Sequence, residues 1–128
     1  MACGKLIPMK SPLPFVLLAA VLLGGCQTAV RPLYYWGNYE SLLYANYSKP
    51  DKAGPAEQAA KLEEDLTKAA AHNLSPNPGL HAQLGFAYYQ LGKTDAAAKE
   101  FAAEKTLFPE SAVFIDRMLA KLKGTPTT

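Results

Sequence analysis

Few residues of this 128-residue sequence are placed where they could do chemistry. The two histidines, His72 and His81, lie on either side of a Pro-containing break, and three consecutive acidic residues (63–65) precede them. Imidazole and carboxylate groups that meet in space can bind a metal ion. Alternatively, His72 interacts with the dipole of a helix end and residues 63–65 form a solvated helix face. We favour the second interpretation and predict no metal site.

Motifs of enzymatic catalysis are not recognisable in the sequence. It contains no Gly-rich phosphate-binding loop, no C-x-x-C pair and no H-E-x-x-H motif. No base is placed by the sequence beside the serines Ser41, Ser48, Ser75 and Ser111. We therefore predict that the protein is not an enzyme and that it needs no cofactor.

Cys26 is the residue whose surroundings indicate a specific modification. The chain has a charged start with Lys5 and Lys10, then an apolar run from Phe15 to Leu23, and then Gly-Gly-Cys26. This order is typical of a secretory signal peptide, and residues 23–26 resemble a bacterial lipobox, whose cysteine thiol receives a diacylglycerol. An ordinary signal peptide with a chance cysteine is the alternative. We predict a signal peptide at 1–25 and a triply acylated Cys26 that anchors the chain without spanning the membrane.

The cellular location and the net charge of the mature chain follow from the same N-terminal segment. An aspartate after the lipidated cysteine would suggest retention in an inner membrane, so Gln27 favours the outer membrane and its periplasmic face. Lys5 and Lys10 leave with the signal peptide, so 13 basic residues become 11, against 11 acidic ones. A near-neutral chain offers no basic face, and we predict no nucleic-acid partner. Cys3 also leaves, so no thiol remains for a disulfide or a metal.

An aromatic block follows a short lipidated tether at 26–33. Residues 34–47 hold five of the seven tyrosines and the only tryptophan. A helix from about 38 to 47 is predicted by residues at helical spacing, namely Tyr35, Tyr39, Leu42, Leu43 and Asn46. The aromatic side chains either wedge this helix against a small helical domain or form an exposed platform for a peptide, a glycan or a protein. Contact with the membrane interface is a third interpretation.

Capping signals divide the rest of the chain into helices. After a loop at 48–55 we expect one helix from Pro55 to about 71 or 72, and one from Pro78 to Leu91 with Asn77 as its cap. A helix at 95–107, capped by Thr94, comes next.

A last helix follows its cap Ser111 and ends at Gly124, before a disordered tail at 125–128. Its predicted inward residues are Val113, Phe114, Met118 and Leu122, with Ile115 and Leu119 as further contacts.

Residues 79–109 determine the predicted fold. Leu84, Gly85 and Tyr88 are followed by Ala97, Phe101 and Pro109, an order and spacing that match the tetratricopeptide repeat. Small residues at 85 and 97 let the two helices approach closely, and Pro109 stops the second helix. We predict an all-α domain at 34–124 with about two tetratricopeptide-like antiparallel helix hairpins, the first one degenerate, and a C-terminal capping helix.

Glu104 departs from that pattern, which favours a small apolar residue at its position. The glutamate either lies exposed at a groove or sits at the edge of a short array. We expect the second.

Three segments after the lipobox carry a resemblance to a known group. They read Y-Y-W-G-N-Y-E-S-L-L-Y (34–44), P-G-L-H-A-Q-L-G-F-A-Y (78–88) and F-P-E-S-A-V-F-I-D-R-M (108–118). The chain resembles a family of small proteobacterial lipoproteins catalogued as a domain of unknown function with tetratricopeptide-like helices. Members are typically encoded beside a lipoprotein similar to the curli secretion protein, which implies an envelope assembly for secretion or a surface structure. The family carries no established catalytic or ligand residues.

Two functions remain as expectations. The first is an outer-membrane-anchored, non-enzymatic adaptor that binds an envelope protein, with a curli-secretion-like lipoprotein as the partner that the resemblance implies. Its candidate binding residues are Tyr35, Trp36, Tyr39, Tyr88 and Tyr89, although packing explains Tyr88 equally well. The second is a lipoprotein that binds peptidoglycan, another glycan or a small ligand through the Tyr/Trp cluster.

Overall fold

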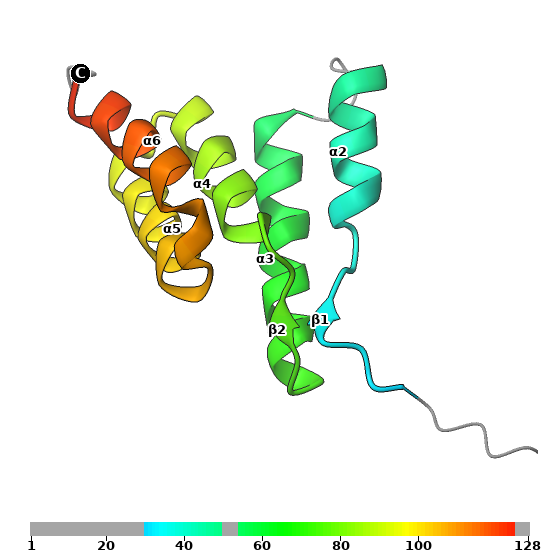
Figure 1. Cartoon of the computed structure of the whole chain (residues 1–128). Helices are drawn as coiled ribbons and strands as arrows, with labels where there is room; N and C mark the ends of the chain where they lie inside the picture. The colour runs from blue at the N-terminus through cyan, green and yellow to red at the C-terminus, as the bar shows by residue number, and fades with distance from the viewer. Residues whose placement is uncertain (1–29, 50–53, 125–128) are drawn as a thin grey trace, which may run out of the picture. The chain divides into compact units, whose positions relative to one another are not determined.

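The computed structural model of the chain describes residues 30–49 and 54–124 (Figure 1). The predicted signal peptide (1–25), the lipidation site Cys26 and the tail 125–128 lie outside the described residues, as do residues 50–53 of the loop predicted at 48–55. The elements described below belong to one unit of contacts that begins at Pro32. Among the described residues, the structure has no helix of the length and apolarity needed to cross a membrane.

Helices form nearly all the regular structure of the described chain, which confirms the predicted all-α class. Every predicted helix is present, with bounds that differ from the prediction by two residues at most. In chain order the elements are β1 (Tyr34–Tyr35), α2 (Tyr39–Ser48), α3 (Pro55–Ala71), β2 (Ser75–Pro76), α4 (Leu80–Gln90), α5 (Thr94–Leu107), the 3-10 helix η1 (Pro109–Ser111) and α6 (Ala112–Gly124).

Helices α2 and α3 form an antiparallel hairpin. Near its start, α2 is joined to the middle of α3, where Asn38 donates hydrogen bonds to Asp65. Near its end, α2 is joined to the start of α3, where the Gln58 side chain donates to Asn46. The two helices therefore run in opposite directions, with α3 between α2 and α4 (Figure 1).

Helices α4 and α5 form a second hairpin with a closer approach. A Cβ added to Gly85 of α4 would lie 2.9 Å from two ring carbons of Phe101 and 3.2 Å from the Ala97 carbonyl oxygen. Ala97 and Phe101 are both fully buried. The predicted close approach at Gly85 and Ala97 is thus confirmed, because only a residue without a side chain fits against this part of α5.

The two hairpins bury corresponding positions. Leu42 of α2 is buried, and so is Leu84 of α4, 42 positions later. In the second helices the buried residues Gln58, Leu62 and Asp65 of α3 correspond to Ala97, Phe101 and Glu104 of α5, each 39 positions later. Ala69 of α3 corresponds in the same way to Phe108, the residue after α5. The first hairpin, which the sequence shows only as a degenerate pair, is therefore built on the same pattern of buried positions as the second.

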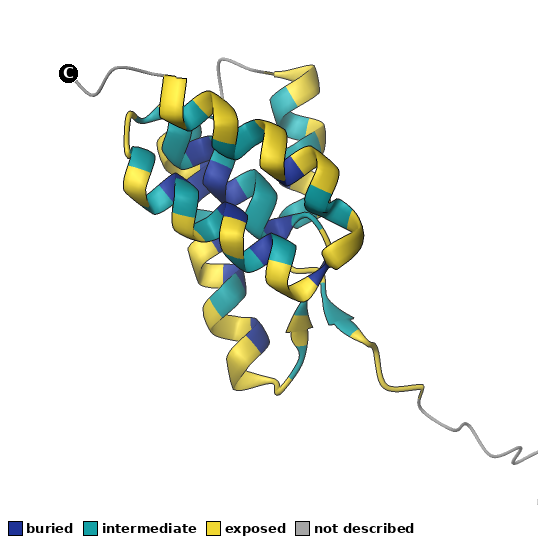
Figure 2. Ribbon diagram, turned by 60° about the vertical axis from the view of Figure 1, so that its left-hand side comes forward, coloured by how far each residue is buried: buried dark blue, intermediate teal, exposed yellow. Residues whose placement is uncertain are grey.

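The apolar core consists of two clusters along the row of helices, and Figure 2 shows buried positions on the helix faces that meet. The first lies among α2, α3 and α4 and contains Leu42, Ala59, Leu62, Leu80, Leu84 and Ala87. The second lies between α5 and α6 and contains Ala97, Phe101 and Ile115. Tyr88 of α4 packs against both clusters, so this helix joins them.

A short parallel strand pair was not predicted from the sequence. Tyr34 pairs with Ser75 and Tyr35 with Pro76, which joins β1 to the connection between α3 and α4. The prediction that Tyr35 belongs to the helical spacing of the next helix is wrong, because Gly37 has a φ of 46° and turns the chain before α2 begins at Tyr39.

Two predicted helix starts differ from the structure. Helix α4 begins at Leu80 rather than Pro78, and the side chain of Asn77 donates to the Pro78 carbonyl oxygen instead of capping the helix. Thr94 is the first residue of α5 rather than its cap. Ser111 likewise does not cap α6 as predicted, because its hydroxyl donates back to the Phe108 carbonyl oxygen within the η1 turn.

The inward face of α6 also differs from the prediction. Val113 is 68% exposed and Phe114 is 56% exposed, whereas Ile115 is fully buried. Met118, Leu119 and Leu122 are half-buried and pack against the second cluster, as expected. The η1 turn sets the rotation of α6, so that Ile115 rather than its two neighbours points at α5.

Ala97→Leu should destabilise the fold. The added side chain has no space between α4 and α5, so we expect the free energy of unfolding to fall by about 1–3 kcal/mol, measured by urea denaturation. Ala102→Leu is the matched control, since Ala102 is exposed on the same helix. Equal stability of the two variants would contradict the close α4–α5 packing.

Candidate functional site

A buried carboxylate organises the start of the first hairpin. Asp65 is fully buried and accepts hydrogen bonds from the Asn38 backbone N–H at 2.7 Å and from the Asn38 side-chain amide at 2.9 Å. The prediction that residues 63–65 form a solvated face is therefore wrong for Asp65, although Glu63 and Glu64 are exposed. A Cβ at Gly37 would overlap this carboxylate, so a residue without one is required there.

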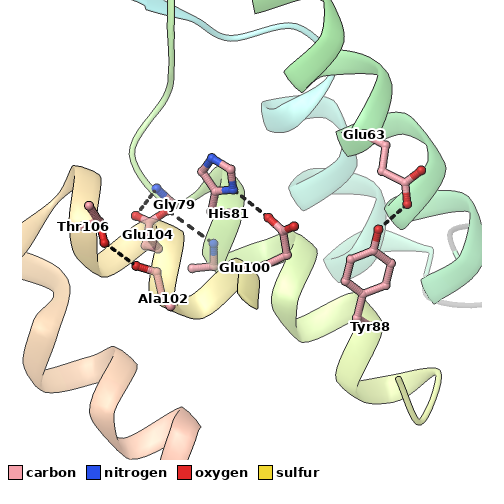
Figure 3. Close-up of polar contacts among 9 residues, drawn as sticks. Glu63, Gly79, His81, Tyr88, Glu100, Ala102, Glu104 and Thr106 are labelled. Atoms are coloured by element: carbon pink, nitrogen blue, oxygen red, sulfur yellow. Dashed lines mark hydrogen bonds and ion pairs between the residues drawn. The ribbon is translucent and has the colours of Figure 1, made fainter. Parts of the chain in front are cut away.

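A second buried carboxylate stands at the start of α4 (Figure 3). Glu104 of α5 is 2% exposed, and its two oxygens accept from the backbone N–H groups of Gly79 at 2.7 Å and Ala82 at 3.3 Å. The first N–H groups of a helix have no partner inside the helix, so an outside acceptor must satisfy them. Glu104 performs the capping role predicted for Asn77, and the prediction that it lies at the edge of the array is wrong.

A cavity of about 620 Å³ opens beside Glu104. Its walls are mostly apolar and come from three helices, with Ala82 and Phe86 of α4, Phe101 of α5, and Phe114 and Met118 of α6. The lining also includes Pro78, Gly79 and four polar side chains, those of Tyr39, Gln83, Glu104 and Ser111. A volume of several hundred Å³ is the size at which proteins bind small ligands or side chains of a partner.

Tyr39 brings the start of α2 to this cavity. The side chain is half-buried, and a Cβ at Gly79 would come into contact with its hydroxyl, so the backbone of residue 79 lies directly against it. Burial raises the pKa of the Tyr39 phenol, and the negative charge of Glu104 raises it further. The hydroxyl is therefore neutral at physiological pH and can donate a hydrogen bond inside the cavity.

The predicted binding residues of the aromatic block lie close to one another but face different surroundings. The ring centroids of Trp36 and Tyr39 are 6.3 Å apart, and Trp36 is 47% exposed. Tyr35 is half-buried and stacks on His72 at 5.8 Å between centroids. Only Tyr39 of these three lines the cavity.

Tyr88 and Tyr89 lie on α4, away from the aromatic block. The Tyr88 hydroxyl donates a short hydrogen bond to Glu63 of α3 (Figure 3). Lys93 lies over the Tyr88 ring, 5.6 Å from its centroid. Tyr89 packs on Phe86, with ring centroids 6.4 Å apart. Neither tyrosine lines the cavity, so the structure does not bring the five predicted residues together on one site.

The two histidines have different partners. His81 Nδ1 lies 2.7 Å from the Glu100 carboxylate, and His72 stacks on Tyr35. Within residues 30–49 and 54–124, no group of three or more His, Cys, Asp or Glu residues could hold a metal ion.

The sequence reasoning missed most residues of the cavity. Phe86, Phe114 and Met118 were either not considered or placed in the core. A signal was present in α4, where Leu84, Phe86 and Tyr88 put apolar side chains on more than one face of the helix. A helix that is apolar on two faces needs a second surface to cover it.

The sequence model of one protein family, described as Domain of unknown function (DUF4810), matches residues 33–118. The match covers more than half of the 128-residue chain, so the chain belongs to this family. It agrees with the predicted membership of a family of unknown function. No curated protein and no solved structure matches the chain.

Asp65→Asn should destabilise the first hairpin, because the amide that replaces one carboxylate oxygen faces a hydrogen-bond donor of Asn38. We expect the free energy of unfolding to fall by about 1–3 kcal/mol in urea denaturation. The control is Glu64→Gln, an exposed neighbour whose ion pair with Lys68 lies on its own helix. Its effect should be smaller, because solvent screens an exposed ion pair. A loss no larger than that of the control would show that the carboxylate is not needed.

The contact between Tyr88 and Glu63 should make stability depend on alkaline pH. The hydrogen bond to Glu63, with burial and the charge of Glu63, raises the Tyr88 pKa from 10.0 to about 12. A phenol whose pKa is raised on folding stabilises the fold below its unfolded pKa, and this contribution is lost as pH rises through about 12. The stability difference between the wild type and Tyr88→Phe should therefore shrink between pH 10 and 12, measured as urea midpoints. A constant difference would contradict the contact.

Proposed function

We propose that this member of the DUF4810 family is a membrane-anchored, periplasm-facing lipoprotein that acts as a non-enzymatic adaptor for an envelope protein. The lipobox at residues 23–26 supports the anchor, with Cys26 as the lipidated residue and the outer membrane as its location. Strand β1 begins at Tyr34, eight residues after Cys26. An extended tether at 27–33 reaches about 25 Å, so the helical domain works close to the membrane surface.

The observation that carries the binding role is the cavity between α4, α5 and α6. Its walls are mostly apolar, and Phe114 at its edge is 56% exposed. Leu107, three residues after the lining residue Glu104 on α5, is also exposed (47%). Exposed apolar surface next to a cavity is typical of a surface that a partner covers. A side chain or short helix of a protein partner fits this arrangement better than a ligand enclosed on all sides.

The repeated hairpins support a tetratricopeptide-like array. Corresponding positions are buried in both hairpins, and α6 packs on the second hairpin as a capping helix. Arrays of this kind offer grooves to peptides and helices. The resemblance to lipoproteins encoded beside a curli-secretion-like lipoprotein supports such a protein as the partner, in a secretion or surface-structure assembly.

A second candidate function is binding of peptidoglycan or another glycan. The observation that favours it is Trp36, which is 47% exposed beside Tyr39 and offers a ring face on which a sugar could stack. This site would lie at the start of α2 and would use only one residue of the cavity.

An affinity pull-down from native membranes tests the adaptor function. The full chain with a C-terminal tag should recover one envelope protein in stoichiometric amount, and so should Val113→Ser. Phe114→Ser should lose it, because Phe114 lines the cavity and Val113 does not. Both residues are exposed, so neither change should alter stability by more than about 0.5 kcal/mol. Cys26→Ala should also lose the partner, because the chain no longer reaches the membrane.

Recovery of no partner by any form would remove the adaptor function. Quenching of Trp36 fluorescence by muropeptides would then support the glycan candidate.

A further inference from the structure

We propose, on the basis of the adaptor function above, that the cavity binds a partner segment in which a large apolar side chain is flanked by lysine or arginine. The cavity is defined by Tyr39 of α2, Phe86 of α4, Glu104 of α5, and Phe114 and Met118 of α6. The occupant is identified by two matching features of this lining, its apolar walls and the sign of its charge.

The lining contains one charged side chain, and it is negative. Glu104 is the only Asp, Glu, Lys or Arg residue among the cavity-lining residues. Lys105, the next residue along α5, does not neutralise it, because its ammonium group is 2.7 Å from the Asp116 carboxylate. An acidic segment would therefore meet the negative charge of Glu104 with no cationic side chain of the lining beside it, and a basic one would be attracted.

The Glu104 carboxylate, which lines the cavity, still has acceptor capacity. Its oxygens accept one hydrogen bond each, from Gly79 and from Ala82. An ionised carboxylate offers about four lone-pair sites, so an ammonium or guanidinium group can be added without breaking the helix cap. Burial raises the pKa of the cavity-lining Tyr39 phenol, and the negative charge of Glu104 adds to this shift.

The apolar walls provide the anchor. Phe86 and Phe114 present aromatic rings and Met118 presents a flexible thioether, a combination that adapts to the shape of a buried side chain. A cation beside the anchor can also lie over an aromatic face, which adds to its attraction by the carboxylate. One large apolar residue with a neighbouring Lys or Arg therefore satisfies both parts of the site.

Selection of peptides gives the first half of the test. The probe is a phage-displayed library of random 12-residue peptides, selected on the purified full chain in detergent micelles and counter-selected on empty micelles. We expect the recovered peptides to combine a large apolar residue with an adjacent Lys or Arg. Recovery of apolar peptides without basic residues would overturn the proposed charge preference while leaving an apolar binding site in place.

Charge reversal at one position gives the second half. Phe114→Glu and Phe114→Lys remove the same aromatic ring but place opposite charges at the cavity, whereas Val113→Glu and Val113→Lys place them one residue away, outside the lining. For a selected basic peptide, measured by fluorescence anisotropy, we expect Phe114→Lys to bind roughly three- to fivefold more weakly than Phe114→Glu, the range of a partly exposed ion pair. The Val113 pair should differ less.

Equal affinities of Phe114→Lys and Phe114→Glu would overturn the proposal. If no selected peptide distinguishes the Phe114 variants from the Val113 variants, the cavity does not bind peptides and the proposal also fails. Failure of the adaptor function itself would give a different result, because the pull-down from membranes would then recover no partner with any form of the chain.

Discussion

Backbone N–H groups at the start of a helix need an acceptor, and both hairpins of this protein supply it from the partner helix. Asp65 of α3 serves the start of α2, and Glu104 of α5 serves the start of α4. Both carboxylates are buried, so each must keep its hydrogen bonds or leave a charge without a partner in the core. This requirement fixes the register of each helix pair, because a shift of one turn would move the carboxylate away from its donors.

The capping of α4 by Glu104 also explains why a carboxylate lies at the cavity. The side chain of Glu104 occupies a position that a repeat of this kind usually fills with a small apolar residue, and it extends toward the start of α4. The backbone of Gly79 can lie against Tyr39 because it carries no side chain. The carboxylate that caps α4 thus also lies at the cavity, where Tyr39, Gln83 and Ser111 are the other polar side chains of the lining.

The sequence predicted the helices well because their apolar spacing and their small residues are local signals, as at Gly85 and Ala97. It failed where distant residues decide the outcome. Asp65 looked like part of a solvated acidic run, and only the donors of Asn38, 27 positions earlier, explain its burial. Phe114 and Ile115 are adjacent apolar residues, and the turn of η1 rather than their type determines which one is buried. The cavity has residues from four helices, so no single stretch of sequence could reveal it.

The pairing of β1 with β2 determines which contacts first resist a pulling force on the chain before Tyr34. A force applied to the chain before Tyr34 acts first on the two-residue strand pair and on the ring contacts of Tyr34 with Phe108 and of Tyr35 with His72. Parallel strands pulled along their length resist in shear, with their hydrogen bonds loaded together. Tension on the chain before Tyr34 would therefore reach the connection between α3 and α4 through the strand pair.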